Sequence, residues 1–121
     1  MKQEWKKWSW RNDSPSTGVF ILWEDEPSGG YEWEIDAIVG RQVGDKWEFA
    51  HYSDSGCSCN GAYDEGPEAY DLAWTDDLMS LVPTVKQSLR TGSFRDAADA
   101  IDAITSFMKF VKDTVKDGVQ E

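Results

Sequence analysis

The apolar residues of the first half of the chain follow patterns that predict β-strands. The segment 19–24, VFILWE, is almost continuously apolar, which is typical of a strand covered on both faces. Between residues 31 and 39, apolar residues alternate with acids, and this period of two predicts a strand with one solvent-facing side. The segment 46–53 alternates in the same way. These three segments therefore predict a sheet.

Two short features define the hairpin expected between the second and third of these strands. Gly44 and Asp45 both tolerate the positive φ that a two-residue hairpin turn demands, so the strands should be joined directly. Gly40 lies within the first strand of this hairpin, where a glycine often marks a bulge. We therefore expect Gly40 to correct the register of the pair.

The last third of the chain has the spacing of three and four that predicts helices. Thr75 is expected to cap the first helix, and Pro83 should either kink it or begin a second helix. Ser93 is expected to cap the final helix and Gly118 to end it. The apolar stripes comprise Leu78, Leu81, Val82, Val85 and Leu89, then Phe94, Ala97, Ala98, Ile101, Ile104, Met108, Val111 and Val115.

Strands followed by helices predict an α+β fold, a three- to four-stranded antiparallel meander with helices packed on one face. The length of 121 residues indicates one domain. Its expected parts are a Trp-rich arm (1–12), the meander (18–53), a Cys-containing acidic loop (54–74) and the helices (75–118).

Charge narrows the classes of partner. The formal net charge is −11, and the segments 13–36 and 48–77 carry seven and eight acids without a single base. Nucleic acids and anionic lipids are bound by Lys and Arg, so neither direct nucleic-acid binding nor membrane binding is expected. The longest apolar run, 19–23, is far too short to span a bilayer. A basic partner protein and mimicry of nucleic acid both fit this charge, although its simplest interpretation is solubility.

The stretch 51–60, HYSDSGCSCN, holds both cysteines and the only histidine of the chain. Two thiolates bind zinc well, so Cys57 and Cys59, with His51 and Asp54, are candidate metal ligands. Paired zinc-binding cysteines are usually separated by two to four residues, whereas here one residue separates them. Two copies of the chain could also supply four thiolates. A bridge between the two cysteines would close a very small ring, so we expect reduced thiols.

Two further interpretations of this stretch remain open. A cysteine could act as nucleophile with His51 as its base and Asp54 orienting the imidazole, although no oxyanion hole or phosphate-binding loop is evident. Alternatively the stretch is a structural turn. In that case the cysteines are small apolar residues, and His51 packs on the same strand face as Trp47 and Phe49. The missing supporting residues favour the structural turn, so no cofactor is expected, with zinc as the alternative.

Seven tryptophans are more than the predicted strands need. Trp23, Trp33 and Trp47 occupy strand positions that face a core. The others are candidates for a contact surface, since tryptophan often anchors protein interfaces. These are Trp5, Trp8, Trp10 and Trp74.

The segment YSDSGCSCNGAYDE, residues 52–65, resembles a family of short uncharacterised proteins from bacteriophages of actinobacteria. The resemblance extends weakly to the preceding hairpin and to the helix near Leu78. It implies a phage origin, residence in the bacterial cytoplasm and a host or phage protein as partner. We therefore expect a small non-enzymatic accessory protein that binds another protein through an acidic, aromatic-rich surface, and a homodimer is compatible with this. Zinc binding is the alternative, and a cysteine-dependent enzyme is the third interpretation.

Overall fold

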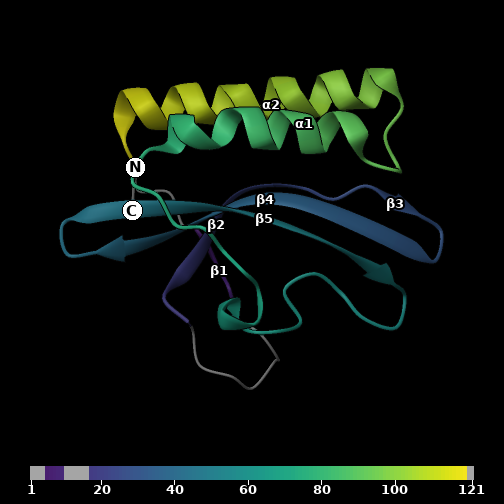
Figure 1. The fold of residues 1–121 in the computed structure, drawn as a ribbon, viewed down its shortest axis with the longest axis horizontal. Helices are drawn as coiled ribbons and strands as arrows, with labels where there is room; N and C mark the ends of the chain where they lie inside the picture. Colours follow the sequence, from purple (N-terminus) through teal and green to yellow (C-terminus); the bar gives the residue numbers. More distant parts are fainter. Residues whose placement is uncertain (1–4, 10–16, 120–121) are drawn as a thin grey trace.

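The computed structural model describes residues 5–9 and 17–119, which form one antiparallel sheet with two α-helices lying along one of its faces (Figure 1). This confirms the predicted α+β class. The strands are β1 (Lys6–Lys7), β2 (Val19–Asp25), β3 (Ser28–Gly29), β4 (Glu32–Val43) and β5 (Lys46–Cys57). The helices are the 3₁₀ turns η1 (Pro67–Ala69) and η2 (Leu78–Leu81), then α1 (Val82–Thr91) and α2 (Ala97–Asp117).

The sheet is the predicted meander, with β2, β4 and β5 pairing in chain order and β1 added beside β2. β3 pairs with the same edge of β4 as β2 does, so these two strands lie end to end. The β4–β5 hairpin turns at Gly44, whose φ is 65°, as predicted. β5 continues to Cys57, four residues beyond the predicted end at residue 53, because β4 provides pairing positions as far as Glu32.

The irregularity expected at Gly40 lies instead in the neighbouring strand. The register of β2 against β4 shifts between Ile21 and Trp23, whereas β4 and β5 pair without a shift through Gly40. As a result, Leu22 and Trp23 both pack toward the helices, while Ile21 belongs to the cluster on the other face. Gly40 provides space for this bulge, since a Cβ there would lie 2.7 Å from Leu22 Cδ1.

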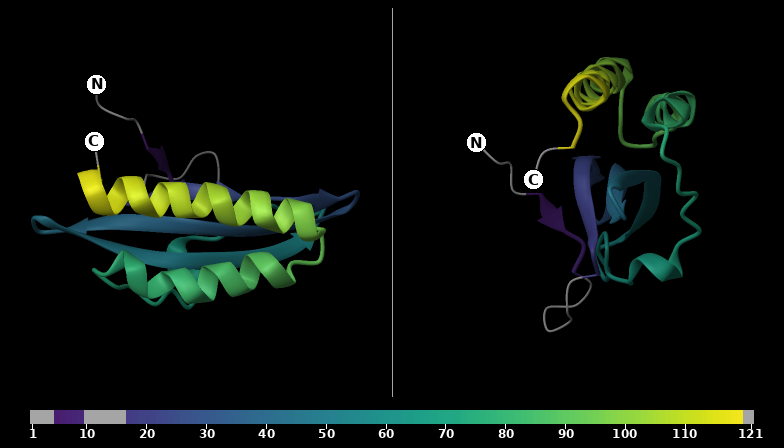
Figure 2. Two further views of the ribbon diagram at one scale, coloured as in Figure 1. Left: turned by 90° about the horizontal axis from the view of Figure 1, so that it is seen from above. Right: turned by 90° about the vertical axis from the view of Figure 1, so that its left-hand side faces the viewer.

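Both faces of the sheet are covered, one by helices and the other by a largely irregular segment (Figure 2). α1 and α2 cover one face through an aliphatic and aromatic core that includes Val85, Leu89, Phe107 and Val111. Trp8 and the segment 62–74 pack against the other face. The side of β4 that alternation predicted to face solvent therefore lies beneath the helices.

The helix ends differ from the sequence expectation at two caps. Asp77 rather than Thr75 caps η2, because Thr75 forms two backbone hydrogen bonds with Phe49 of β5. Asp96 rather than Ser93 caps α2, accepting a hydrogen bond from the Asp99 amide.

Two other helix predictions are confirmed. The helical region does divide near Pro83, which lies in the first turn of α1 immediately after η2. Gly118 ends α2 with a φ of 76°.

Replacing Gly40 with valine should destabilise the fold by about 1–3 kcal/mol, because the new side chain overlaps Leu22 and Trp47. Urea denaturation measures the change in unfolding free energy. Gly61→Ala is the matched control, since a Cβ at Gly61 meets only Asp64 at an ordinary 3.6 Å. Equal effects of the two substitutions would show that Gly40 has no packing role.

Candidate functional site

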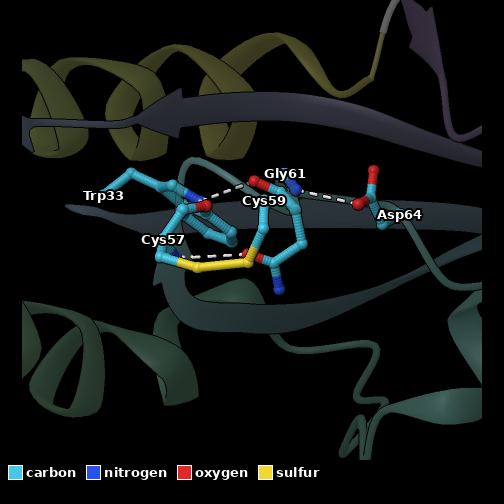
Figure 3. Close-up of a disulfide and its surroundings, with 6 residues drawn as sticks. Trp33, Cys57, Cys59, Gly61 and Asp64 are labelled. Carbon is cyan, nitrogen blue, oxygen red and sulfur yellow. Dashed lines mark hydrogen bonds between the residues drawn. A yellow bond between two sulfur atoms is a disulfide. The ribbon is translucent and has the colours of Figure 1, made fainter. Parts of the chain in front are cut away.

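The two cysteines form a disulfide at the end of β5, which we call the CxC turn (residues 57–60; Figure 3). Both are exposed. The expectation of reduced, apolar thiols is therefore wrong for this structure. The chain reverses immediately after the strand, with the Asn60 amide donating to the Cys57 carbonyl at 3.1 Å. This reversal brings the two Cα atoms to 5.4 Å, within the usual range for a disulfide.

Contacts that do not involve sulfur hold the backbone of the CxC turn. The Trp33 indole Nε1 donates to the carbonyl oxygens of Cys57 and Asn60, both at 3.0 Å. The Asn60 side-chain oxygen accepts from the Cys57 amide at 3.1 Å. A Cβ at Gly56 would lie 2.7 Å from Trp33 Cζ2, so only glycine lets the indole approach this closely.

The four residues considered as zinc ligands do not converge. His51 contacts Asp36 on the helix-facing side of the sheet, whereas Asp54 accepts from the Tyr52 hydroxyl at 2.8 Å on the opposite face. His51 is also six residues before Cys57 along an extended strand, a separation of about 20 Å. Across residues 5–9 and 17–119, no three His, Cys, Asp or Glu side chains gather as a metal site would require. The same separation of about 20 Å keeps His51 too far from Cys57 to act as the base for a cysteine nucleophile.

A charged network lies beneath the helices and was not foreseen from the sequence. The Asp36 side chain is only 4 % exposed and is approached by Ser88 Oγ at 2.5 Å, His51 Nε2 at 2.7 Å and Arg95 Nη1 at 3.5 Å. Arg95, whose side chain is 2 % exposed, also pairs with Asp25 at 2.7 Å and with Glu34 at 3.5 Å. One guanidinium thus joins three carboxylates from two strands.

The order of groups in this network does not match that of a catalytic triad. Nucleophilic activation needs the imidazole between the hydroxyl and the carboxylate. Here the carboxylate of Asp36 lies between Ser88 and His51, and both contact the same oxygen. Glu34 in addition accepts hydrogen bonds from the backbone amides of Ser93 and Phe94. The network therefore attaches the α1–α2 loop to the sheet.

Trp8, expected at a contact surface, is a core residue. It is fully buried, its indole donates to the Glu65 carbonyl at 3.0 Å, and its ring centroid lies 4.9 Å from Tyr52 and 5.0 Å from Tyr63. The Trp-rich arm has no helical or strand periodicity of apolar residues, so its sequence gave no signal that Trp8 is buried. The three tyrosines around Trp8 are Tyr52, Tyr63 and Tyr70. Burial is the main cause that raises the pKa of each of their hydroxyl groups above 10.0.

Trp5 and Trp74, also expected on the contact surface, lie on opposite faces of the sheet. Trp74 is half-buried, with the Arg41 guanidinium 4.1 Å from its ring centroid. Trp5 is half-buried and packs against the helix-side core. Trp10 falls outside the described residues. Among the residues that the structure describes, Trp5, Trp8 and Trp74 therefore do not form one surface.

Two acid-lined hollows lie beside α2 on its β2 side. Their volumes are about 730 and 470 Å³, Ser106 lines both, and together we call them the α2 groove. Its lining includes two cations, Lys109 and Arg95, each paired with a carboxylate. Its aromatic residues are Trp5, Trp23, Phe94 and Phe110. Its six acids are Asp25, Glu26, Asp99, Asp102, Asp113 and Asp117.

Residues 9–114 match the profile of DUF7574, a domain of unknown function. The chain belongs to this family. The DUF7574 match spans β2 to β5 and most of α2, so it includes the CxC turn, the charged network and most of the α2 groove. No curated protein and no solved structure matches the chain. Within the part of the DUF7574 chain that the structure describes, no helix has the length and apolar character needed to cross a membrane.

Replacing Arg95 with methionine in this DUF7574 chain should cost about 3–5 kcal/mol of unfolding free energy, because the largely buried carboxylates of Glu34 and Asp36 lose their cation. Lys109→Met is the control, since the Lys109–Asp113 pair is exposed and should contribute less than about 0.5 kcal/mol. Chemical denaturation measures both. Similarly small losses of unfolding free energy in both variants would mean that the ion pairs of Arg95 do not stabilise the fold.

Raising the pH above 10 should destabilise the fold. A tyrosine with a raised folded-state pKa contributes stability below its unfolded pKa of 10.0 and loses that contribution as pH rises toward the folded value. Near-ultraviolet phenolate absorbance and denaturant midpoints measured together test this. Tyr63→Phe removes one such group and should reduce the pH dependence. Ionisation of Tyr52, Tyr63 and Tyr70 near pH 10 in a folded protein would contradict it.

Proposed function

We propose that this chain is a small non-enzymatic accessory protein of phage type that acts in the bacterial cytoplasm by binding a basic segment of another protein. The α2 groove is the observation that supports this proposal. The groove combines an excess of carboxylates with aromatic side chains, as the expected acidic, aromatic-rich surface would. Of the four tryptophans expected on that surface, Trp5 lines the groove, where it is joined by Trp23.

The dimensions of the α2 groove suit an extended or helical segment of a partner. Its α2 residues run from Asp99 to Asp117, about 27 Å along the helix axis. Acids lie at both ends, and Trp5, Trp23 and Phe110 lie toward the Asp117 end. A lysine or arginine side chain can place its charge near the carboxylates and its methylene groups on the rings.

The electrostatics at one end of the groove favour a cationic occupant. Burial and the neighbouring Glu24 raise the pKa of Glu26, while Lys6 opposes this change. Burial is the larger cause, and the repulsion from Glu24 adds to it. A basic side chain of a partner would relieve the repulsion between Glu24 and Glu26, and salt should weaken the attraction because the groove is open.

The experiment compares two double variants of the full chain. Asp99→Asn with Asp102→Asn removes two charges from the α2 groove, and Asp45→Asn with Asp71→Asn removes two exposed charges elsewhere. The probe is a fluorescent peptide of alternating lysine and leucine. A peptide with glutamate in place of each lysine is the control of opposite charge. Binding is followed by fluorescence anisotropy.

The lysine peptide should bind the groove variant about fivefold to tenfold more weakly than the parent chain, since two attractive charges are lost. The control variant should stay within about twofold, because only the overall charge has changed. Equal losses in both variants, or equal binding of the two peptides, would refute the groove as the binding surface.

A further inference from the structure

We infer that the CxC turn is a thiol–disulfide exchange site whose co-reactants are dithiols and small disulfides. This inference concerns a different part of the molecule from the α2 groove and does not rest on the proposed protein binding. It is carried by the exposure of the disulfide together with the sulfur-independent contacts that hold the turn.

The disulfide is accessible to a reagent. Cys57, Ser58, Cys59 and Asn60 are all exposed, at the end of a strand. Exchange requires a thiolate to reach a sulfur atom, so accessible disulfides react while buried structural ones resist. In Figure 3 the two sulfurs lie along the lower edge of the turn, and the Trp33 indole lies above them, next to the backbone to which it donates.

The turn should keep its shape when the disulfide is reduced. Two hydrogen bonds from Trp33 Nε1 and two between Cys57 and Asn60 fix the backbone without using either sulfur. The two thiols would therefore remain side by side at high effective concentration after reduction. The disulfide closes a loop with only one intervening residue, so its loss releases little chain entropy.

The reaction is a two-electron exchange. The thiolate of an incoming dithiol attacks Sγ of one cysteine and forms a mixed disulfide. The Cys57–Cys59 bond breaks, and its electron pair goes to the other Sγ, which takes a proton from solvent. The second thiol of the reagent, as thiolate, attacks its own sulfur in the mixed disulfide and releases the first cysteine, which is then protonated. The protein gains two electrons and two protons, and the reagent leaves as a cyclic disulfide.

The experiment uses the full chain without denaturant. Because the chain has only two cysteines, alkylation with a maleimide followed by mass measurement counts thiols without ambiguity. Protein treated with oxidised glutathione should show no free thiol, and dithiothreitol should expose two. The circular dichroism spectrum and the melting temperature should hardly change, and the reduced and oxidised forms should bind the lysine peptide equally.

A pair of variants tests whether the hydrogen bonds from the Trp33 indole hold the two cysteines in place for exchange. Trp33→Phe removes the two indole hydrogen bonds, so the reduced variant should re-form its disulfide about fivefold or more slowly with oxidised dithiothreitol. Trp47→Phe, at the other end of the hairpin, is the control and should re-form it at the parent rate. Cys59→Ser should accumulate a stable mixed disulfide between Cys57 and glutathione.

Several results would overturn the inference. The disulfide could resist dithiothreitol until the protein is denatured, or fail to form under oxidised glutathione. Reduction could unfold the chain, which would make the disulfide a structural staple. Equal re-oxidation rates in the Trp33→Phe and Trp47→Phe variants would show that the Trp33 hydrogen bonds do not position the cysteines.

Discussion

The position of the Arg95 guanidinium is the constraint on which the helical layer depends. Arg95 stands in the loop between α1 and α2, yet its side chain lies against Asp25 of β2 and against Glu34 and Asp36 of β4. Removing these charges from water is costly, and only their mutual contacts offset that cost. Arg95 therefore attaches the α1–α2 loop to β2 and β4, next to the amides of Ser93 and Phe94 that bind Glu34.

The two faces of the sheet are built from different interactions. The helix face combines an aliphatic and aromatic core with the charged network. The ion pairs of this network link the α1–α2 loop to particular residues of β2 and β4. The opposite face is aromatic, with Trp8 packed among Tyr52, Tyr63 and Tyr70 and its one polar atom bonded to a backbone carbonyl. This arrangement explains why a chain of 121 residues uses so many large rings. An irregular segment can cover a sheet when a few bulky residues contribute most of the buried surface.

Local patterns were sufficient to predict the meander, the turn at Gly44, the division near Pro83 and the helix end at Gly118, because each depends on neighbouring residues. They could not show which side of β4 faces solvent. The acids at positions 34 and 36 look solvated until an arginine about sixty residues later is placed between them. Burial of Trp8 and the displaced bulge at Leu22 depend likewise on distant packing. At the candidate site, spacing alone suggested reduced cysteines, since the turn that joins them relies on Trp33 from another strand.

The arrangement of β3, β4 and β5 has a steric consequence. At the start of β4, Trp33 pairs with Ser28 of β3 on one side and with Gly56 of β5 on the other. β3 directly follows the acids at one end of the α2 groove, and β5 leads into the CxC turn, so both features lie toward the same end of the molecule (Figure 1). Two strand spacings, about 10 Å, separate β3 from β5 at this position. A bulky occupant that projects past the end of the groove would shield the sulfurs from large reagents while leaving them open to small ones.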